Sequence, residues 1–465
     1  MAMSAFKSAI LIFILGSLPA PLRPAADELP RGQIIDRVVC AANTEQSYAL
    51  YLPSRYTPDR ASPIIFCFDP GARGRLPVEL FRDAAERYGY ILAASNNSRN
   101  GPAGLSSSAM QAMWNDTQSR LSIDPARAFA AGMSGGARVA CGFAQSGSFL
   151  AGVIAFAAGF PGAQAPKKGG FIFFGAAGVD DFNYPELRRL DGDLEKLGMT
   201  KRIVSFAGGH GWPPAAVCIQ AIEWLELQAM KAGKLTRNSA MIDGFFAKEE
   251  ASIGASETAG VAGEVYLLTR AVANDFRGLK DISSLEGSAA RLAASREVKK
   301  YLQEEKDMQA TQNSREAEML ALWNQRYGTE NSGTAIASAA SLIEELNRQS
   351  KATSDSASRR IARRVLQGSY IHAIEESRSL LERKDYQGAA QMLELAIAIH
   401  TDRPQILFNL AAIYAKARDR RKTLEALRKA VEQGYRDAVA IESDDSFQFL
   451  RSDPAIKKIL TQIRN

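Results

Sequence analysis

A serine flanked by glycines is the first candidate for chemistry in this sequence. Gly132, Ser134 and Gly136 form a G-x-S-x-G pentapeptide. Ser134 comes directly after the apolar, strand-like run ARAFAAGM and directly before the helix-like run GARVACGFAQ. A serine on a sharp turn from strand to helix exposes its hydroxyl, and the glycines let the turn close without Cβ clashes. We therefore expect Ser134 to be a nucleophile rather than a serine in an ordinary glycine turn.

A serine hydroxyl becomes a strong nucleophile only when a neighbouring base accepts its proton. The chain has three histidines, and only His210 lies in the same part of the sequence as Ser134. His210 follows the strand-like run KRIVSFAGG, which places it on a loop after a strand. We expect His210 to be the base, and we expect His372 and His400 to be surface or packing residues.

The base in turn needs a carboxylate, which fixes the imidazole tautomer and stabilises its charged form. Asp180 and Asp181 follow the apolar run GFIFFGAAG, so that the chain order is serine, aspartate, histidine. Adjacent aspartates point to different sides, and only one of them can serve. We prefer Asp181 and keep Asp180 as the alternative. The remaining aspartate is expected to cap the helix that begins near Tyr184.

An attacked carbonyl oxygen develops negative charge, which N–H donors stabilise. The N–H of Gly135 points outward at the start of the helix after Ser134, where the helix dipole favours an anion. The loop after the strand-like run PIIFCF reads DPGARG, and it offers Gly71 or Ala72 as a second donor. A glycine-rich loop also fits an ordinary turn.

From residue 46 to residue 232 the chain alternates between two periodicities, and the resulting elements must position these residues. Short apolar runs such as PIIFCF and GVIAFAA alternate with helix-like segments such as PVELFRDAAERY and YPELRRLDGDLEKLG. This alternation predicts an α/β fold of βαβ units with a mainly parallel sheet. Apolar strands without strict alternation fit a sheet that is covered on both faces.

Residues 46–232 resemble α/β-hydrolases of the poly(3-hydroxybutyrate) depolymerase, feruloyl esterase and dienelactone hydrolase-like group. The resemblance covers well under half of the chain, and it is carried by FCFDPGARG, SNNSRNGP, IDPARAFAAGMSGGARVA, GVDDFNY and GGHGWPP. It implies that Ser134, Asp181 and His210 form a triad that hydrolyses acyl esters. The loop DPGARG departs from the His-Gly start of that group, which leaves the second oxyanion donor open.

Two segments are candidates for binding the substrate. The run SNNSRNGP follows a strand end at the active-site edge and offers Asn96, Asn97 or Asn100, although a polar loop without this role fits equally well. Trp212 lies close to His210, where it either forms a wall of the acyl pocket or simply packs.

The amino-acid composition limits the classes of protein to which this chain can belong. The 465 residues exceed one ordinary domain, and 46% hydrophobic with 23% charged residues is normal for a globular protein. The net charge of +6 is spread along the chain, so we expect no nucleic-acid partner. With three histidines and no C-x-x-C spacing we expect no metal, and ester hydrolysis by a triad needs no cofactor. Cys67 and Cys141 are expected to be buried thiols, and Cys40 with Cys218 is the one pair considered for a disulfide.

The N-terminus has the pattern of an export signal. Lys7 precedes the apolar run AILIFILGSL, which is too short to span a bilayer, and small residues and prolines follow. We expect cleavage near Ala20 or Ala26 and a periplasmic or secreted protein without a stable membrane span. An uncleaved anchor or a buried first helix is the alternative.

After Lys234 the sequence becomes rich in Ala, Glu, Arg and Leu and predicts an all-α region. The segments Asp385–Ile399 and Asp419–Gln433 repeat each other at a spacing of 34 residues, the period of tetratricopeptide helix pairs; an ordinary helical bundle is the alternative. We expect a signal peptide at 1–26, an α/β-hydrolase domain at 27–234, a helical linker domain at 235–365 and tetratricopeptide-like repeats at 366–465.

Together these features predict an exported serine hydrolase that cleaves small or polymeric carboxylic esters through an acyl-enzyme, with repeats that bind a protein partner. A binding or scaffold protein with a vestigial hydrolase domain is the alternative from another class, because repeat arrays expose concave surfaces. A peptidase of the same fold is a third hypothesis.

Overall fold

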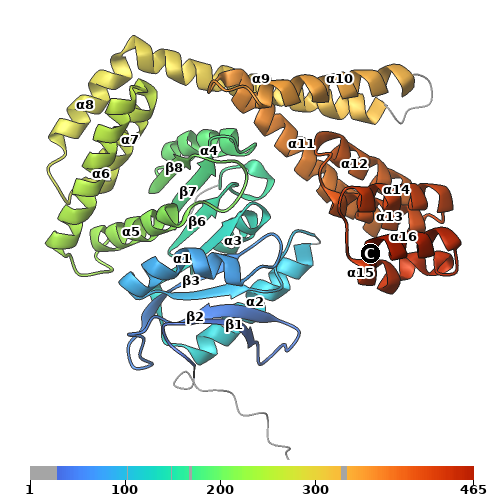
Figure 1. Cartoon of the computed structure of the whole chain (residues 1–465). Coiled ribbons are helices and arrows are strands. Elements are labelled where there is room, and N and C mark those ends of the chain that lie inside the picture. The colour runs from blue at the N-terminus through green and yellow to red at the C-terminus, as the bar shows by residue number, and fades with distance from the viewer. Residues whose placement is uncertain (1–28, 102, 148, 167–169, 326–331, 465) are drawn as a thin grey trace, which may run out of the picture.

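The computed structural model describes residues 29–101, 103–147, 149–166, 170–325 and 332–464, so the predicted signal peptide at 1–26 lies outside the described residues. An eight-stranded sheet with the order β1-β2-β4-β3-β5-β6-β7-β8 forms the first half of this chain (Figure 1). β2 pairs antiparallel with β1 and with β4. The other neighbouring pairs in the sheet, which involve β3 to β8, are all parallel. The strands are β1 Ile34–Val39, β2 Ser47–Tyr51, β3 Ser62–Phe68, β4 Ile91–Ser95, β5 Ile123–Met133, β6 Gly152–Phe156, β7 Ile172–Gly178 and β8 Lys201–Phe206.

The sheet confirms the α/β-hydrolase fold that the sequence predicts. Seven of its strands coincide with the expected apolar runs, and β1 is an additional edge strand before the predicted start at residue 46. Five helices cover it: α1 Arg75–Tyr88, α2 Ala103–Arg120, α3 Gly135–Ser146, α4 Tyr184–Lys196 and α5 Ala215–Lys231.

Both faces of the sheet are buried, which explains why its strands are apolar throughout. Along β3, Ile64, Phe66 and Phe68 pack in one core with α2, α3 and α4, whereas Ile65 and Cys67 pack in the opposite core with α1 and α5. This alternation follows from the two-residue period of a strand.

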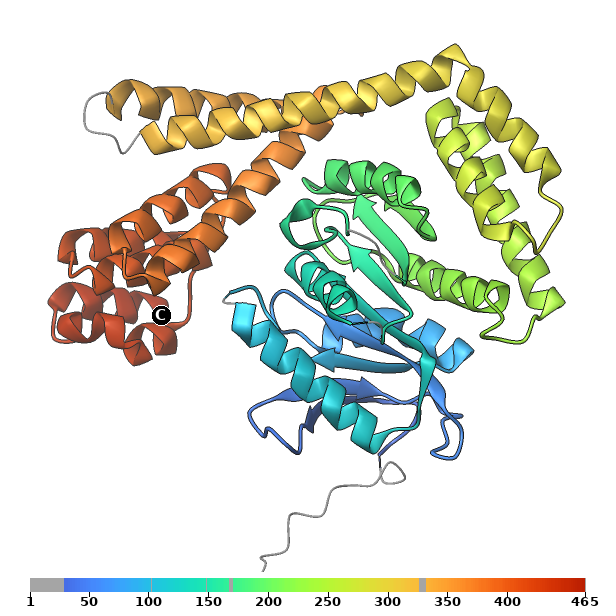
Figure 2. The same ribbon diagram turned by 180° about the vertical axis from the view of Figure 1, so that it is seen from behind.

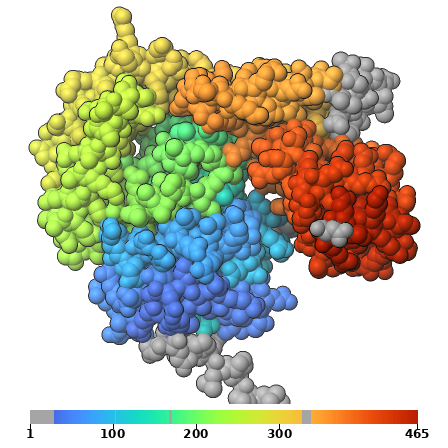
Figure 3. All heavy atoms as spheres, viewed as in Figure 1, coloured from blue at the N-terminus to red at the C-terminus, as the bar shows by residue number. Residues whose placement is uncertain are grey.

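The remaining chain is helical, as predicted, and forms an arch around the α/β part (Figure 2). Helices α6 to α8 run along one side, α9 and α10 cross to the other side, and α11 leads into the C-terminal helices (Figure 1). In the space-filling view the C-terminal part, in red, lies on the opposite side of the α/β part from the yellow-green helical part (Figure 3). The bounds are α6 Ser239–Ala259, α7 Ala262–Phe276, α8 Ser283–Ala294, α9 Arg296–Gln325, α10 Ser332–Ser350, α11 Ala357–Glu382, α12 Tyr386–Ile399, α13 Pro404–Lys416, α14 Arg420–Glu432, α15 Ala438–Ser443 and α16 Pro454–Arg464.

A buried ion-pair network joins the first helices of the arch to the sheet. Arg202 on β8 is 2% exposed, and its guanidinium contacts Asp275 of α7 and Glu249 of α6, each at 2.8 Å. Trp224 of α5 donates its indole N–H to Asp275 at 2.8 Å. A buried charge needs such partners, so this network fixes α6 and α7 against the edge of the sheet.

The C-terminal helices repeat local features at the predicted spacing. Asp385 caps α12 by accepting the N–H of Gly388, and Asp419 caps α14 by accepting that of Lys422. The residue before each cap, Lys384 or Arg418, has a left-handed φ of 61°. The predicted boundary at 365/366 falls inside α11, which is one continuous helix.

The four cysteines are buried and free, so the disulfide considered between Cys40 and Cys218 is not formed. Cys67 and Cys141 are buried thiols, as predicted. Burial raises the pKa of Cys40 to about 11, which keeps this thiol protonated at neutral pH. Among the described helices, none has both the length and the apolar character needed to cross a membrane.

Candidate active site

Ser134 occupies the sharp turn between β5 and α3. Its φ of 54° is unusual for a residue other than glycine, and such strained backbone clusters at functional sites. The Ser134 N–H donates to the carbonyl of Phe156 at 2.8 Å, which anchors the turn to β6. A Cβ on Gly132 would overlap the Gly136 carbonyl, so the turn closes only with glycine there.

Ser134, His210 and Asp181 form a hydrogen-bonded chain. His210 Nε2 lies 2.8 Å from Ser134 Oγ, and His210 Nδ1 lies 2.9 Å from Asp181 Oδ1. The His210 side chain is 6% exposed and that of Asp181 is fully buried. An ionised Asp181 can only accept, so Nδ1 carries the proton and Nε2 is free to accept the serine proton. The N–H of Asn183 also donates to Asp181 Oδ1, at 2.8 Å.

Asp180, the alternative acid, points away from the histidine. Its Oδ2 accepts a hydrogen bond from Arg363 of α11 at 2.7 Å. The expectation that this aspartate caps α4 is wrong: the residue at the cap position is Asn183, and no side chain caps it. The preference for Asp181 over Asp180 matches the geometry, because only Asp181 reaches His210.

The expected oxyanion donors differ in availability. Gly135 is the first residue of α3, and its N–H has no acceptor within the helix. In contrast, the Gly71 N–H donates to Asp69 Oδ1 at 2.8 Å, and the Ala72 N–H donates to the Asp69 carbonyl at 3.2 Å. Both candidates for the second donor are therefore engaged within their own loop.

Asp69 organises this loop from a buried position. It accepts hydrogen bonds from the Arg73 guanidinium and from the Trp212 indole at 2.8–2.9 Å. Burial raises the pKa of Asp69, but these hydrogen bonds and that of the Gly71 N–H outweigh it and hold the pKa below its usual range. A negative charge therefore persists beneath the loop that carries Gly71 and Ala72.

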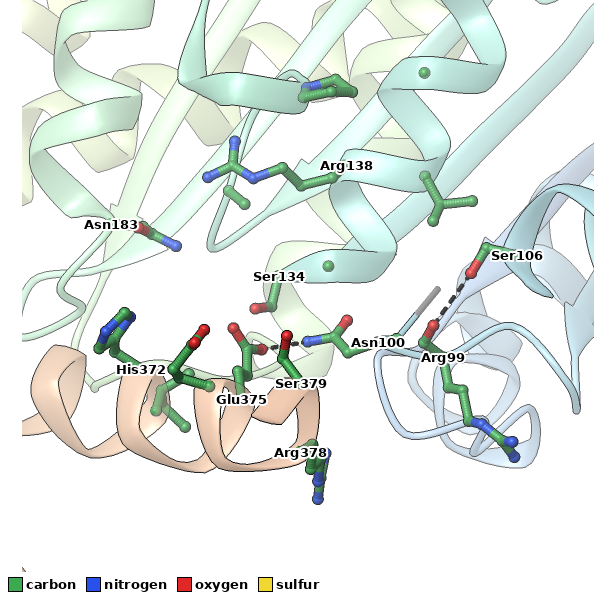
Figure 4. A pocket seen from close by; sticks show the side chains of 18 of the residues that line it. Arg99, Asn100, Ser106, Ser134, Arg138, Asn183, His372, Glu375, Arg378 and Ser379 are labelled. Carbon is green, nitrogen blue, oxygen red and sulfur yellow. Dashed lines mark hydrogen bonds between the residues drawn. The ribbon is translucent and has the colours of Figure 1, made fainter. Parts of the chain in front are cut away.

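A cavity of about 1040 Å³ opens beside Ser134 (Figure 4). The α/β part contributes Asn100, Arg138, Phe143 and Phe182 to its lining, and the facing wall is helix α11. The residues that α11 contributes include Ile371, His372, Glu375, Glu376, Ser379 and Glu382. Asn100 Nδ2 bridges the two sides by donating to Glu375 Oε1 at 2.5 Å.

The residues expected to bind substrate lie elsewhere, with one exception. Asn96 donates to the Asp36 carbonyl, and Asn97 joins two backbone groups, at Ser47 and Glu45. Their side chains thus hold the β1–β2 region in place, and neither residue lines the cavity. Asn100 is the member of this segment that does.

Trp212 packs in the core rather than forming a wall of the acyl pocket. Its ring lies edge-on against Phe156 at a centroid distance of 5.7 Å, and it does not line the cavity. The ring over the histidine is that of Phe182, with a centroid distance of 4.3 Å.

The α11 wall is the part of the site that the sequence analysis missed. His372, expected to be a surface or packing residue, is exposed and lines the cavity. His400 packs against Tyr370, and burial lowers the pKa of its imidazole. In the described part of the chain, no group of three or more His, Cys, Asp or Glu side chains is arranged to hold a metal ion.

Solved esterases have a similar fold over part of this chain. A ferulic acid esterase is 14% identical with a TM-score of 0.35, over 41% of this chain and 96% of the esterase. A hyperthermophilic esterase from the archaeon Pyrobaculum calidifontis is 11% identical with a TM-score of 0.37, over 44% and 86% of the two chains. A thermophilic esterase, Est2, from the Planctomycetes species Thermogutta terrifontis is 16% identical with a TM-score of 0.35, over 47% and 98%. No protein-family model and no curated protein matches this sequence significantly.

Proposed function

We propose that this protein is an exported serine hydrolase that cleaves carboxylic esters. The observation that carries the proposal is the continuous chain from Ser134 Oγ through His210 to the buried Asp181 carboxylate, with distances of 2.8 and 2.9 Å. A nucleophile, a base and an orienting acid in this order are what acyl transfer requires.

In this mechanism Ser134 Oγ attacks the ester carbonyl carbon while His210 Nε2 accepts its proton. Asp181 holds the imidazole and stabilises its positive charge. The carbonyl oxygen becomes an oxyanion that accepts the Gly135 N–H. His210 then protonates the leaving alkoxide, and an acyl-enzyme remains. A water molecule, deprotonated by His210, releases the acid by the same steps in reverse order.

The cavity supports an ester that carries polar groups beside apolar ones. Met110, Phe143 and Ile371 supply apolar surface, whereas Asn100 and Glu375 supply hydrogen-bonding groups close to Ser134. We propose small or polymeric esters of this mixed character as substrates. We also propose that the C-terminal helix pairs are tetratricopeptide-like and bind a protein partner, which their 34-residue spacing supports.

The test is covalent labelling of residues 27–465 with a fluorophosphonate probe, followed by intact mass measurement. The parent is expected to gain one adduct and Ser134→Ala none. Ser252→Ala, in an exposed position of α6, serves as the matched control and is expected to label like the parent. A folded parent that stays unlabelled would overturn the proposal and leave a binding or scaffold protein as the better account.

A further inference from the structure

The first half of α11 forms hydrogen bonds with the two loops that carry Asp181 and His210, here called the acid loop and the base loop. On the acid loop, Arg363 donates to Asp180 Oδ2 at 2.7 Å, and Arg364 donates to the Val179 carbonyl with two nitrogens, at 2.5 and 3.0 Å. On the base loop, Gln367 Oε1 accepts the backbone N–H of His210 at 3.0 Å. The three side chains lie within about one helical turn, so a single stretch of helix holds both loops.

These contacts are closely packed. Arg364 is 1% exposed, and its guanidinium lies 4.4 Å from the centre of the Tyr184 ring. A Cβ on Gly209 would come within 3.1 Å of the Gln367 amide, so the base loop approaches the helix at a residue without a side chain. Gln312 of α9 forms a further hydrogen bond with the acid loop, donating to the Phe182 carbonyl at 2.9 Å.

The two loops also contact each other. Within the α/β part, the Asp180 N–H donates to the Gly208 carbonyl at 2.9 Å and joins the loops to each other. Contacts from outside the α/β part come from α11 to both loops and from Gln312 of α9 to the acid loop. A partly buried hydrogen bond to the backbone of His210 itself restricts where the imidazole lies relative to Ser134, and small displacements of reacting groups reduce rates strongly.

We propose that α11 is a working part of the catalytic site, with Gln367 as a positioning residue for His210 and with Arg363 and Arg364 as positioning residues for the acid loop. This inference rests on the proposed function, since positioning matters only if Ser134 reacts. The helical region then does more than tether the enzyme, because it completes the geometry of the triad.

The test compares three variants of the full chain in steady-state hydrolysis of p-nitrophenyl acetate. Gln367→Met keeps the size of the side chain and removes the acceptor, whereas Gln367→Glu keeps an acceptor. Gln405→Met makes the same change at an exposed position of α13 and is the control. We expect Gln367→Met to lower kcat by about tenfold or more, with KM and the thermal midpoint little changed.

Gln367→Glu is expected to restore most of the lost kcat, because its carboxylate keeps an oxygen that can accept the His210 N–H. A residue that only supports the fold would lower kcat together with the thermal midpoint, whereas loss of the acceptor should lower kcat alone.

The proposal is overturned if Gln367→Met keeps the kcat of the Gln405→Met control. If Gln367→Met does not fold, Arg363→Met carries the same comparison, because the Arg363 side chain is 36% exposed and its loss leaves no large cavity. Labelling of Ser134 in the parent separates this failure from that of the proposed function: a labelled parent with unaffected variants refutes the positioning role alone.

Discussion

Two neighbouring glycines after Ser134 should respond in opposite ways to the addition of one methyl group. A Cβ on Gly135 would overlap Asn100 Oδ1 and lie 2.7 Å from Asn100 Cγ, which is the far end of a flexible side chain. A Cβ on Gly136 would overlap the Phe68 carbonyl oxygen and lie 2.6 Å from its carbon, which belong to β3. Neither glycine has a left-handed backbone, so alanine is strained at neither position by its φ angle.

The magnitudes follow from what must move. In Gly135→Ala the Asn100 side chain swings away and its hydrogen bond to Glu375 is lost; because this bond is exposed to solvent, which weakens interactions with a charge, the loss costs about 0.5–1.5 kcal/mol. Replacing glycine by alanine in a helix gains about 0.4–1 kcal/mol through the unfolded state, so the net change in stability is close to zero. In Gly136→Ala the helix must shift from the strand, and overpacking costs about 1–3 kcal/mol or more.

A double-mutant cycle with Asn100→Ala sharpens this prediction. Without the Asn100 side chain, Gly135→Ala has nothing to displace and should stabilise the protein by about 0.4–1 kcal/mol. Gly136→Ala should cost nearly the same in both backgrounds, since its Cβ would meet the Phe68 backbone and not the Asn100 side chain. Chemical denaturation followed by tryptophan fluorescence measures all of these differences. The reasoning is refuted if Gly135→Ala is as destabilising as Gly136→Ala, or if it shows no coupling to Asn100.

Two further substitutions test the acids around the site. Asp181→Asn should lower kcat for ester hydrolysis by about 10⁴-fold because an amide fixes the wrong imidazole tautomer, whereas Asp180→Asn, which weakens only the contact with α11, should lower it by no more than about tenfold; equal losses would contradict the assignment of the acid. Asp69→Asn should destabilise the protein by about 1–3 kcal/mol at neutral pH, since it weakens hydrogen bonds to a buried charge. The pKa of Asp69 is lowered on folding, so this stabilisation is present above the unfolded pKa of about 3.9 and is lost as the pH falls through the folded value. The unfolding free energies of parent and variant should therefore converge in acid, and a difference that is constant with pH would rule out this account.

The features that were predictable from the sequence are those that depend on local pattern and on the order of residues along the chain. Apolar runs of four to seven residues became strands because both faces of the sheet are covered, and loops after the carboxyl ends of parallel strands meet at one edge. That rule brings Ser134, Asp181 and His210 together from three separate loops. The choice between the two aspartates also follows from local geometry, because neighbouring side chains on the tight turn after β7 point to different sides.

The local sequence pattern did not predict the role of side chains that hydrogen-bond the backbone of another segment. Asn96 and Asn97 were expected near the substrate because they follow β4, yet each amide hydrogen-bonds the β1–β2 region. Asn100, a few residues further along the same loop, reaches the cavity. Amide side chains three or four residues apart look alike in a sequence, and only the course of the loop decides which of them faces Ser134.

The α11 contacts had no sequence signal at all. They join residues 157 to 185 positions apart, and a glutamine and two arginines are ordinary on the surface of a helix. The predicted domain boundary at 365/366 also divides this helix. The structure shows one helix of 26 residues, about 39 Å long at 1.5 Å per residue.

That continuity changes how the enzyme and scaffold hypotheses relate to each other. The first half of α11 holds the acid and base loops, its middle lines the cavity, and its second half packs against α12, where Ser377 donates to the Ala389 carbonyl at 2.8 Å. Hydrogen bonds that involve a charged group contribute about 1.5–3 kcal/mol each, so detaching Arg363 and Arg364 from the acid loop would cost several kcal/mol. A partner that bound the C-terminal helices and tilted α11 would have to meet this cost, and it would move the loops of Asp181 and His210 as it did so. If the C-terminal helices bind a partner and Ser134 reacts as proposed, the two events are linked through one helix, and by thermodynamic reciprocity a ligand that fills the cavity against α11 should change the affinity for that partner.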